Sequence, residues 1–138
     1  MSERIYIPIH ISADGSTAFN VSMSLGRKVQ LIGVLLSDYA GVAAHGSNHI
    51  TFAVSGSDES TAVWTYSTAS AAQGAITAKD IIGVAPDGQT VTVARSLLSV
   101  AGSLFVYDPT QAMIVACANG GSGQAKNAVV TLIFKPVS

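Results

Sequence analysis

The sequence predicts an all-β protein, a two-sheet antiparallel sandwich of about eight strands with a jelly-roll-like arrangement. Apolar residues recur at every second position, as in "RIYIPIHIS" (4–12), where four isoleucines would share one face of a strand. Turn signals such as "ADGST" (13–17) and "APDG" (85–88) separate such stretches about every 8 to 12 residues. No long stretch follows the helical period, so alternating strands and helices are excluded.

The first half of the chain carries five expected strands. Their ranges are 4–12, 18–25, 29–36, 49–56 and 61–68. Pro8 cannot donate a ladder hydrogen bond, so the first strand is expected at a sheet edge or as part of an N-terminal arm. The stretch "SDYAGVAAHGSN" (37–48) contains small residues and two glycines, which predicts a long loop.

The second half of the chain is less regular. Residues 69–73 could form a short helical turn, and Gly74 argues against a longer helix. Further strands are expected over 89–94, 103–107, 112–119 and 127–137, with a hairpin loop over the glycine-rich stretch 120–126. We therefore expect one domain spanning 1–138 with a short N-terminal arm over about 1–12. An immunoglobulin-like sandwich is the second choice, because the Cys…Trp…Cys spacing of true immunoglobulin domains is absent.

The composition points to a surface that is covered by other protein. Hydrophobic residues make up 49% of the chain, but charged residues only 11%, against about 25% in typical soluble domains. A lone soluble protein normally relies on mixed surface charge to stay dispersed. The net charge of −1 offers no positive field for phosphates, which argues against nucleic-acid binding.

No segment predicts export or a membrane span. The N-terminus lacks the charged and then apolar regions of a secretory signal. The longest apolar run, "LIGVLL" (31–36), is far too short to cross a bilayer. The sequence thus predicts synthesis in the cytoplasm of the host cell and no membrane partner.

No motif predicts catalysis, a metal or a cofactor. Cys117 lies in the apolar run "AMIVACA" (112–118) and is expected to be a small buried hydrophobe. His45 and His49 are four residues apart in a loop, and a zinc site would need a third ligand, for which Asp38 is the nearest carboxylate. Solvated loop histidines are the simpler interpretation. An enzyme of the cupin type would need clustered histidines, whereas those here are scattered.

Two expected strands, 29–36 and the last strand over 129–134, are apolar on both faces, and this predicts a subunit interface. The faces of 29–36 would carry Val29, Leu31 and Leu35 on one side and Ile32, Val34 and Leu36 on the other. Only one face of each sheet in a sandwich meets the core. A neighbouring copy is the simplest cover for the second face, and the loop 37–48 is the competing one. We expect a homo-oligomer, specifically a trimer.

The candidate interface also includes aromatic residues. The full set is Ile32, Val34, Leu36, Trp64 and Tyr66. Trp64 and Tyr66 share one face of a strand and suit a protein–protein contact or a core. The alternative is a glycan- or receptor-binding module, in which Trp64, Tyr66 and Tyr107, with Tyr39, would form a platform for sugar rings.

Four segments carry a resemblance to a known group of proteins. They are "GRKVQLIGVLLSD" (26–38), "TYSTASAAQGAITAKDIIGV" (65–84), "VAGSLFVYD" (100–108) and "AVVTLIFKP" (128–136). In style the chain resembles the capsid-associated cement or decoration proteins of tailed bacteriophages and the jelly-roll bases of head fibres. The resemblance implies a non-enzymatic protein on the capsid surface of a virion, whose partners are copies of itself and the major capsid protein. It carries over no functional residues.

Overall fold

The computed structural model describes residues 4–13, 19–24, 26–55, 62–72, 74–84, 106–107 and 113–136. These ranges contain strands and turns and no helix. The strands are β1 (Ile5–Ala13), β2 (Phe19–Met23), β3 (Val29–Asp38), β4 (Ile50–Ser55), β5 (Ala62–Ser67), β6 (Ile82–Val84), β7 (Val106–Tyr107), β8 (Met113–Asn119) and β9 (Lys126–Pro136). The all-β prediction is confirmed.

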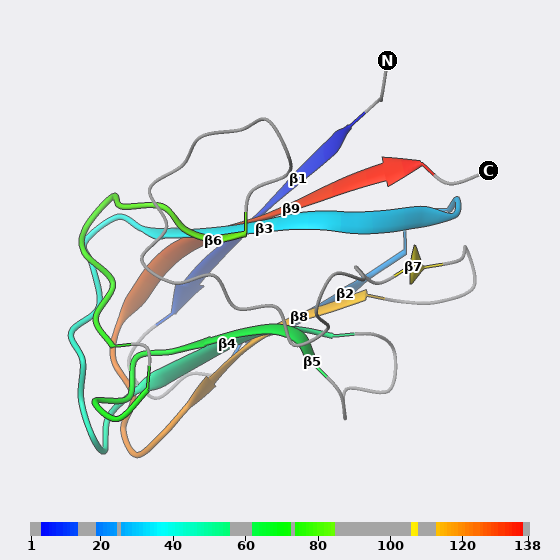
Figure 1. The fold of residues 1–138 in the computed structure, drawn as a ribbon. Helices are drawn as coiled ribbons and strands as arrows, with labels where there is room; N and C mark the ends of the chain where they lie inside the picture. Colours follow the sequence, from blue (N-terminus) through cyan, green and yellow to red (C-terminus); the bar gives the residue numbers. More distant parts are fainter. Residues whose placement is uncertain are drawn as a thin grey trace.

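The strands form two antiparallel sheets that lie as two layers (Figure 1). Sheet 1 has the order β1-β9-β3-β6, with the short β7 also paired to β3, and sheet 2 has the order β2-β8-β4-β5. When β7 is set aside, the first strand pairs with the last, the second with the second to last, and so on inward to β4 and β5. This nested pairing is the strand arrangement of a jelly roll, so the predicted fold class is confirmed.

The core fills the space between the inner faces of the two sheets. Its largest fully buried side chains are Trp64, Tyr66, Phe52 and Phe134, the first three from sheet 2 and the last from β9 of sheet 1. Alternate residues along each strand point inward, so apolar residues spaced by two reach the same core. Burial of these side chains is the main contribution to stability of the fold.

The outermost strand β1 of sheet 1 follows the alternation read from the sequence. Along β1, Ile9 and Ile11 are buried, whereas Tyr6 and His10 are exposed. Pairing of Ile5 with Phe134 and of Ala13 with Lys126 joins β1 to β9 along its whole length. The expectation of an edge strand is confirmed, and the expectation of an arm is wrong from Ile5 onward.

A β-bulge in β3 changes which of its residues face the core. Leu31 pairs with Phe134, but the next pair on β9 is Gly33 with Ile133, so Ile32 is an extra residue on β3. A bulge of this kind shifts the alternation by one position. As a result Leu31 and Val34 both point into the core, although they are three positions apart.

Other expected elements differ in detail. Residues 69–72 form a single turn, closed by a hydrogen bond from the Ala72 amide to the Ala69 carbonyl (2.9 Å), within the range where a short helical turn was expected. The short β6 was not expected, because three residues around Gly83 give too little alternation to recognise. The expected strand 89–94 lies outside the described residues, and of 103–107 only β7 is described.

Candidate assembly surface

Four of the five predicted interface residues lie in the core instead. Val34, Leu36, Trp64 and Tyr66 are each at most 1% exposed and belong to the core cluster. For Val34 and Leu36 the cause is the bulge at Ile32, which turns both inward. Ile32 itself is half-buried at the bulge. The interface prediction is therefore wrong for these four side chains.

Trp64 and Tyr66 of β5 also do not form the predicted aromatic platform for a glycan. The Tyr66 hydroxyl donates to the backbone carbonyls of Gly74 (3.2 Å) and Ala75 (3.3 Å). The indole nitrogen of Trp64 is buried and has no hydrogen-bond partner. A sugar ring cannot reach either face of these two rings. The side chain of Tyr107 lies outside the described residues.

The outer face of sheet 1 carries all the large apolar side chains that are exposed in the described part of the chain. They are Tyr6 on β1, Tyr39 directly after β3, Ile81 directly before β6 and Val129 on β9. Tyr39 continues the ladder, since its amide donates to the Asn127 carbonyl (2.9 Å). Its ring is 67% exposed, and the Lys79 ammonium lies 5.2 Å from the ring centre. The sequence signal for this face was the second apolar set on the last strand, which includes Val129.

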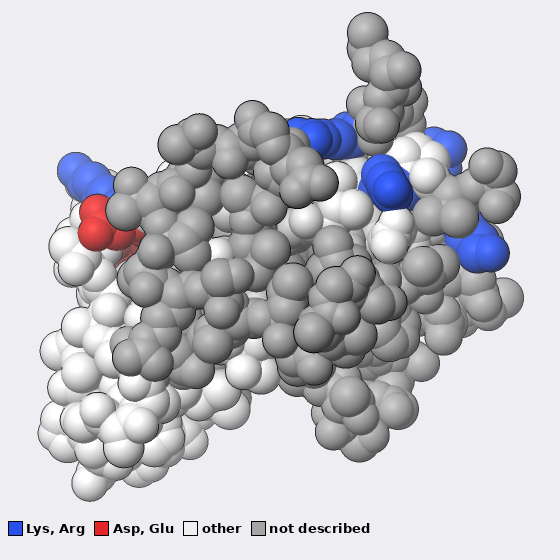
Figure 2. All heavy atoms as spheres, in the orientation of Figure 1, with Lys and Arg blue, Asp and Glu red and all other residues white. Residues whose placement is uncertain are grey.

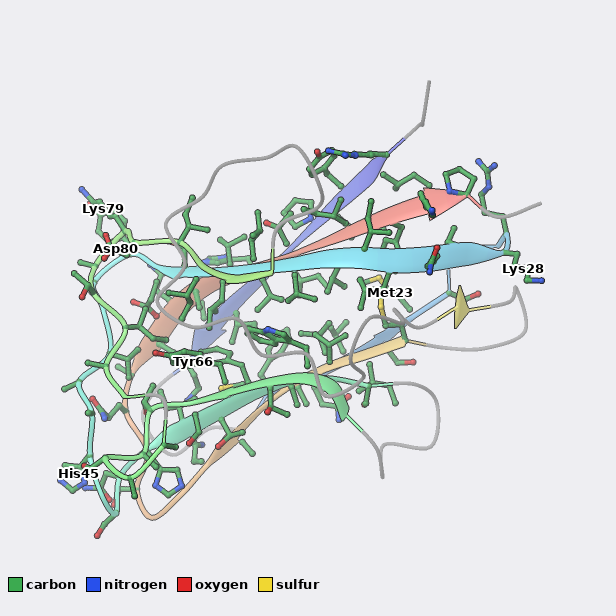
Figure 3. The ribbon with its side chains drawn as sticks, in the orientation of Figure 1. Met23, Lys28, His45, Tyr66, Lys79 and Asp80 are labelled. Carbon is green, nitrogen blue, oxygen red and sulfur yellow. The ribbon has the colours of Figure 1, made fainter. Side chains whose placement is uncertain are left out.

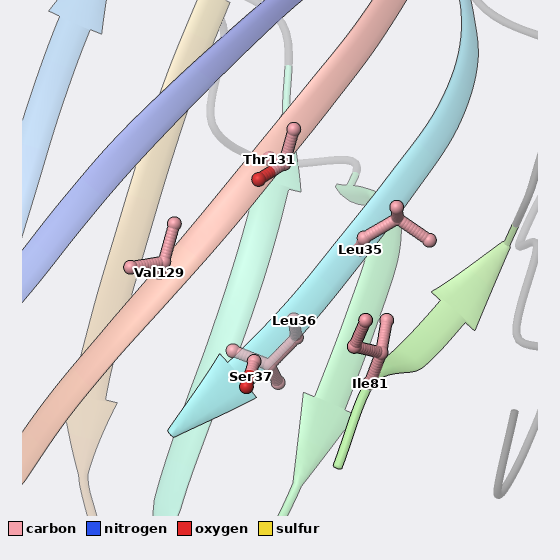
Figure 4. Close-up of a pocket in the computed structure, with 6 residues that line it drawn as sticks. All are labelled: Leu35, Leu36, Ser37, Ile81, Val129 and Thr131. Carbon is pink, nitrogen blue, oxygen red and sulfur yellow. The ribbon is translucent and has the colours of Figure 1, made fainter. Parts of the chain in front are cut away.

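A shallow hollow of about 110 Å³ lies on this face (Figure 4). Leu35, Leu36 and Ser37 of β3 line it together with Ile81, Val129 and Thr131. Its volume is well below the roughly 300 Å³ or more of typical small-molecule pockets. A hollow of this volume suits one side chain of another protein better than a cofactor. Farther along β9, Ile133 is fully buried, although its partner on β1, Tyr6, is exposed.

The outer face of sheet 2 is different in kind. Its outward positions carry small or polar side chains, namely Asn20, Ser22, Thr51, Ala53, Thr65, Ser67, Ala116 and Ala118, with the nearly buried Ile114. None of these residues is charged. Figure 2 shows how few Lys, Arg, Asp and Glu atoms lie on the described surface in this view, and that they are found in its upper half. The low charge read from the sequence is therefore most evident on the outer face of sheet 2, whereas the exposed Lys135 belongs to β9 of sheet 1.

Loops joined by hydrogen bonds close one end of the sandwich. Val42 and Ile76 form a two-way backbone bridge (2.9 and 2.8 Å) between the loop after β3 and the segment before β6. The Gln124 amide donates to the carbonyls of Ala43 (2.7 Å) and Asn48 (2.8 Å), which ties in the β8–β9 hairpin. Figure 1 shows the loop after β3 at this end. The loop 37–48 therefore does not cover the outer face of a sheet, which was the competing explanation for the second apolar face.

Asp38 holds this closed end to sheet 1. Its carboxylate accepts hydrogen bonds from the amides of Ala40 (3.0 Å), Gly41 (2.9 Å) and Asn127 (3.1 Å), and the residue is 1% exposed. The first two bonds form the turn that ends β3, and the third reaches β9. Asp38 therefore has a structural role and does not contribute to a zinc site.

Each of the three histidines makes its own separate contacts. The His45 Nδ1 accepts hydrogen bonds from the amides of Ser47 (3.0 Å) and Asn48 (2.7 Å) and so fixes its own loop, at the end where Figure 3 also labels Lys79 and Asp80. The ring of His49 packs against Gly120. His10 lies on β1, where its Nε2 contacts the Asn127 side chain. Within the described ranges, no three His, Cys, Asp or Glu side chains form a group that could hold a metal ion.

Cys117 lies on the inner face of β8 and is 1% exposed, which confirms the expectation of a buried residue. Burial raises the pKa of its thiol from 9.0 to about 11, although the nearby charge of Lys126 acts in the opposite direction. A thiol with so high a pKa holds almost no reactive thiolate at neutral pH. Cys117 is therefore a packing residue.

Comparisons with known proteins give little further information. No protein-family model matches the sequence, and no curated protein matches it. Among solved structures, the chain is similar to "Structure of infectious bursal disease virus Gx strain" (TM-score 0.34, 13% identity) over 98% of this chain and 33% of that one. A second similar structure is "Crystal structure of infectious bursal disease virus VP2 subviral particle" (TM-score 0.27, 12% identity), over 99% of this chain and 42% of that one.

The chain thus spans less than half of each matched protein. At these TM-scores neither likeness carries an argument about what the chain does. Among the residues that the structure describes, there is no helix of the length and apolarity needed to span a bilayer.

Proposed function

We propose that this chain is a non-enzymatic structural protein of a virion, and specifically a cement or decoration protein that binds to other subunits on a capsid. The observation that carries the proposal is the unequal character of the two outer faces. Every exposed large apolar side chain among the described residues lies on the outer face of sheet 1. Apolar side chains that are exposed on one face of a sheet suit contact with other protein.

Three further properties support an assembly role. The jelly roll is a fold that viral capsid domains use. The low proportion of charged residues lowers the cost of removing the surface from water when subunits meet. The hollow beside Val129 fits a single side chain, which suits a protein contact better than a small ligand.

The expected partners are copies of the chain, as a trimer, and the major capsid protein of a tailed phage. The alternative, a glycan- or receptor-binding module, has lost its main support because Trp64 and Tyr66 are buried in the core. No other observation on the described residues favours this alternative function.

The proposal is tested by the native mass of the purified protein and by its co-sedimentation with phage heads that lack a decoration protein. Val129→Asp places a charge beside the hollow and is expected to weaken association by at least about tenfold. Ala118→Asp is the matched control, since it puts the same carboxylate on the exposed outer face of sheet 2. A monomeric protein at micromolar concentration that also fails to sediment with heads would rule out the proposed role.

A further inference from the structure

Two side chains at the closed end of the sandwich join the sheets to each other. Asn119 is the last residue of β8 in sheet 2, and Lys126 is the first residue of β9 in sheet 1. The hairpin 120–125 between them crosses from one sheet to the other. The Lys126 ammonium donates to the Asn119 side-chain oxygen (3.0 Å) and to the Gln124 carbonyl (3.2 Å).

The burial of Lys126 is unusual. The residue is only 3% exposed, whereas a lysine is almost never fully buried unless its charge is paired. A lysine amine acts as a nucleophile once it has lost its extra proton, and catalytic lysines are found in desolvated sites. In this structure the amine is held next to a carboxamide, which is an electrophile that a lysine amine can attack.

A buried carboxylate lies on the neighbouring strand. Asp38 of β3 pairs with Ala128 of β9, and Lys126 is two residues further along β9. Residues in this diagonal relation on the same face of a sheet are about 7–8 Å apart, within reach of a long side chain. The Asp38 carboxylate also accepts the amide of Asn127, the residue that follows Lys126. A base in this position can take up the proton that the lysine must lose.

We propose that Lys126 and Asn119 form an intramolecular isopeptide bond that covalently joins the two sheets. The Lys126 Nζ attacks the side-chain carbonyl carbon of Asn119, and a new C–N bond forms. The bond between that carbon and the Asn119 Nδ2 breaks, and the nitrogen leaves as ammonia with the proton given up by the amine. The step is an amide exchange, so it requires neither oxidant nor co-substrate, and proximity in a buried site supplies its rate.

The test is the intact mass of the purified full-length chain after incubation at 37 °C. The isopeptide bond lowers the mass by about 17 Da, the mass of one ammonia. Trypsin cannot cleave after an acylated lysine, so a branched peptide that contains both residues is expected. Lys126→Arg keeps the positive charge but removes the nucleophile, and Asn119→Ala removes the electrophile, so both should show the full mass. Lys135→Arg, an exposed lysine of the same strand, should retain the loss.

One competing reaction gives the same change in mass. Asn119 precedes Gly120, and an attack by the Gly120 backbone nitrogen would form a succinimide and also release ammonia. That nitrogen is engaged with the His49 carbonyl (2.9 Å), which disfavours the attack. Loss of ammonia that persists in Lys126→Arg would identify the succinimide and overturn the proposal, as would the unmodified mass in the parent protein. Loss that disappears in Lys126→Arg, with the branched peptide present in the parent, supports it.

Discussion

Gly83 of β6 lies so close to Val34 of β3 that a Cβ atom at position 83 would fall 2.0 Å from the Val34 carbonyl oxygen. The two strands can pair here only because residue 83 has no side chain. The φ of Gly83 is also +131°, a value that other residues rarely adopt.

Gly83→Ala is therefore expected to destabilise the protein by about 3 kcal/mol or more, through the clash and the backbone strain together. Urea unfolding measures the change. Gly26→Ala is the matched control, because Gly26 has a φ of +70° but no atom within 4 Å of the added Cβ. That variant should lose only about 1 kcal/mol. Equal losses in the two variants would show that β6 does not approach β3 as closely as described.

Val34 and Leu35 are consecutive strand residues and therefore face opposite sides, and the bulge at Ile32 makes Val34 the inward one. Val34→Asp buries a carboxylate in the core and is expected to cost more than about 4 kcal/mol, so that the variant is largely unfolded. Leu35→Asp places the same group at the outer hollow and should cost about 1 kcal/mol or less. Circular dichroism and urea titration distinguish the two. A folded Val34→Asp would place the bulge elsewhere in β3.

Asp38 satisfies three backbone amides at the closed end. Asp38→Ala leaves them without an acceptor in a buried site and is expected to cost about 3 kcal/mol. Asp38→Asn keeps one acceptor oxygen, so its loss should be about half as large. Hydrogen exchange of the amides of Ala40, Gly41 and Asn127 gives a local reading of the same bonds. Unchanged protection in Asp38→Ala would contradict the assigned role.

The raised pKa of Cys117 predicts a loss of stability at alkaline pH. The unfolded thiol loses its proton near pH 9, but the folded thiol keeps its proton to about pH 11. Between these values the folded state binds more protons, so the free energy of unfolding falls as the pH rises, by up to about 3 kcal/mol. Urea unfolding from pH 8 to 11 should show a steeper decline in the parent protein than in Cys117→Ala. Parallel declines would mean that the thiol titrates normally in the fold.

The sequence predicted the elements whose residues alternate without interruption. In β1, and in β9 from Ala128 to Phe134, each inward residue is apolar, so the pattern alone identifies both the strand and its buried face. In β3 almost every residue is apolar, and a bulge in such a run leaves no trace in the sequence. Val34 and Leu36 were therefore assigned to the wrong side.

The sequence predicted that an apolar outer face exists, but it did not predict which residues form that face. The second apolar set on the last strand, which includes Val129, correctly indicated an outer face with apolar residues. The aromatic pair Trp64 and Tyr66 has the same spacing whether it points to solvent or to the core, so the sequence could not decide between them. The burial of Lys126 was not foreseen, because it depends on the hairpin crossing between two sheets, which is a tertiary feature.

The nested pairing of the strands also determines when the chain can fold. Ile5 meets Phe134, and Phe19 meets Cys117, so the earliest strands wait for partners that are more than ninety residues away along the chain. Such distant pairings are slow to form, and unpaired strand edges are prone to aggregate until they do. While the chain is still being made, β1 and β3 remain without their shared neighbour until β9 has emerged from the ribosome. A nascent chain that stops before Lys126 should be held by chaperones or degraded, and should not accumulate as a partly built sandwich.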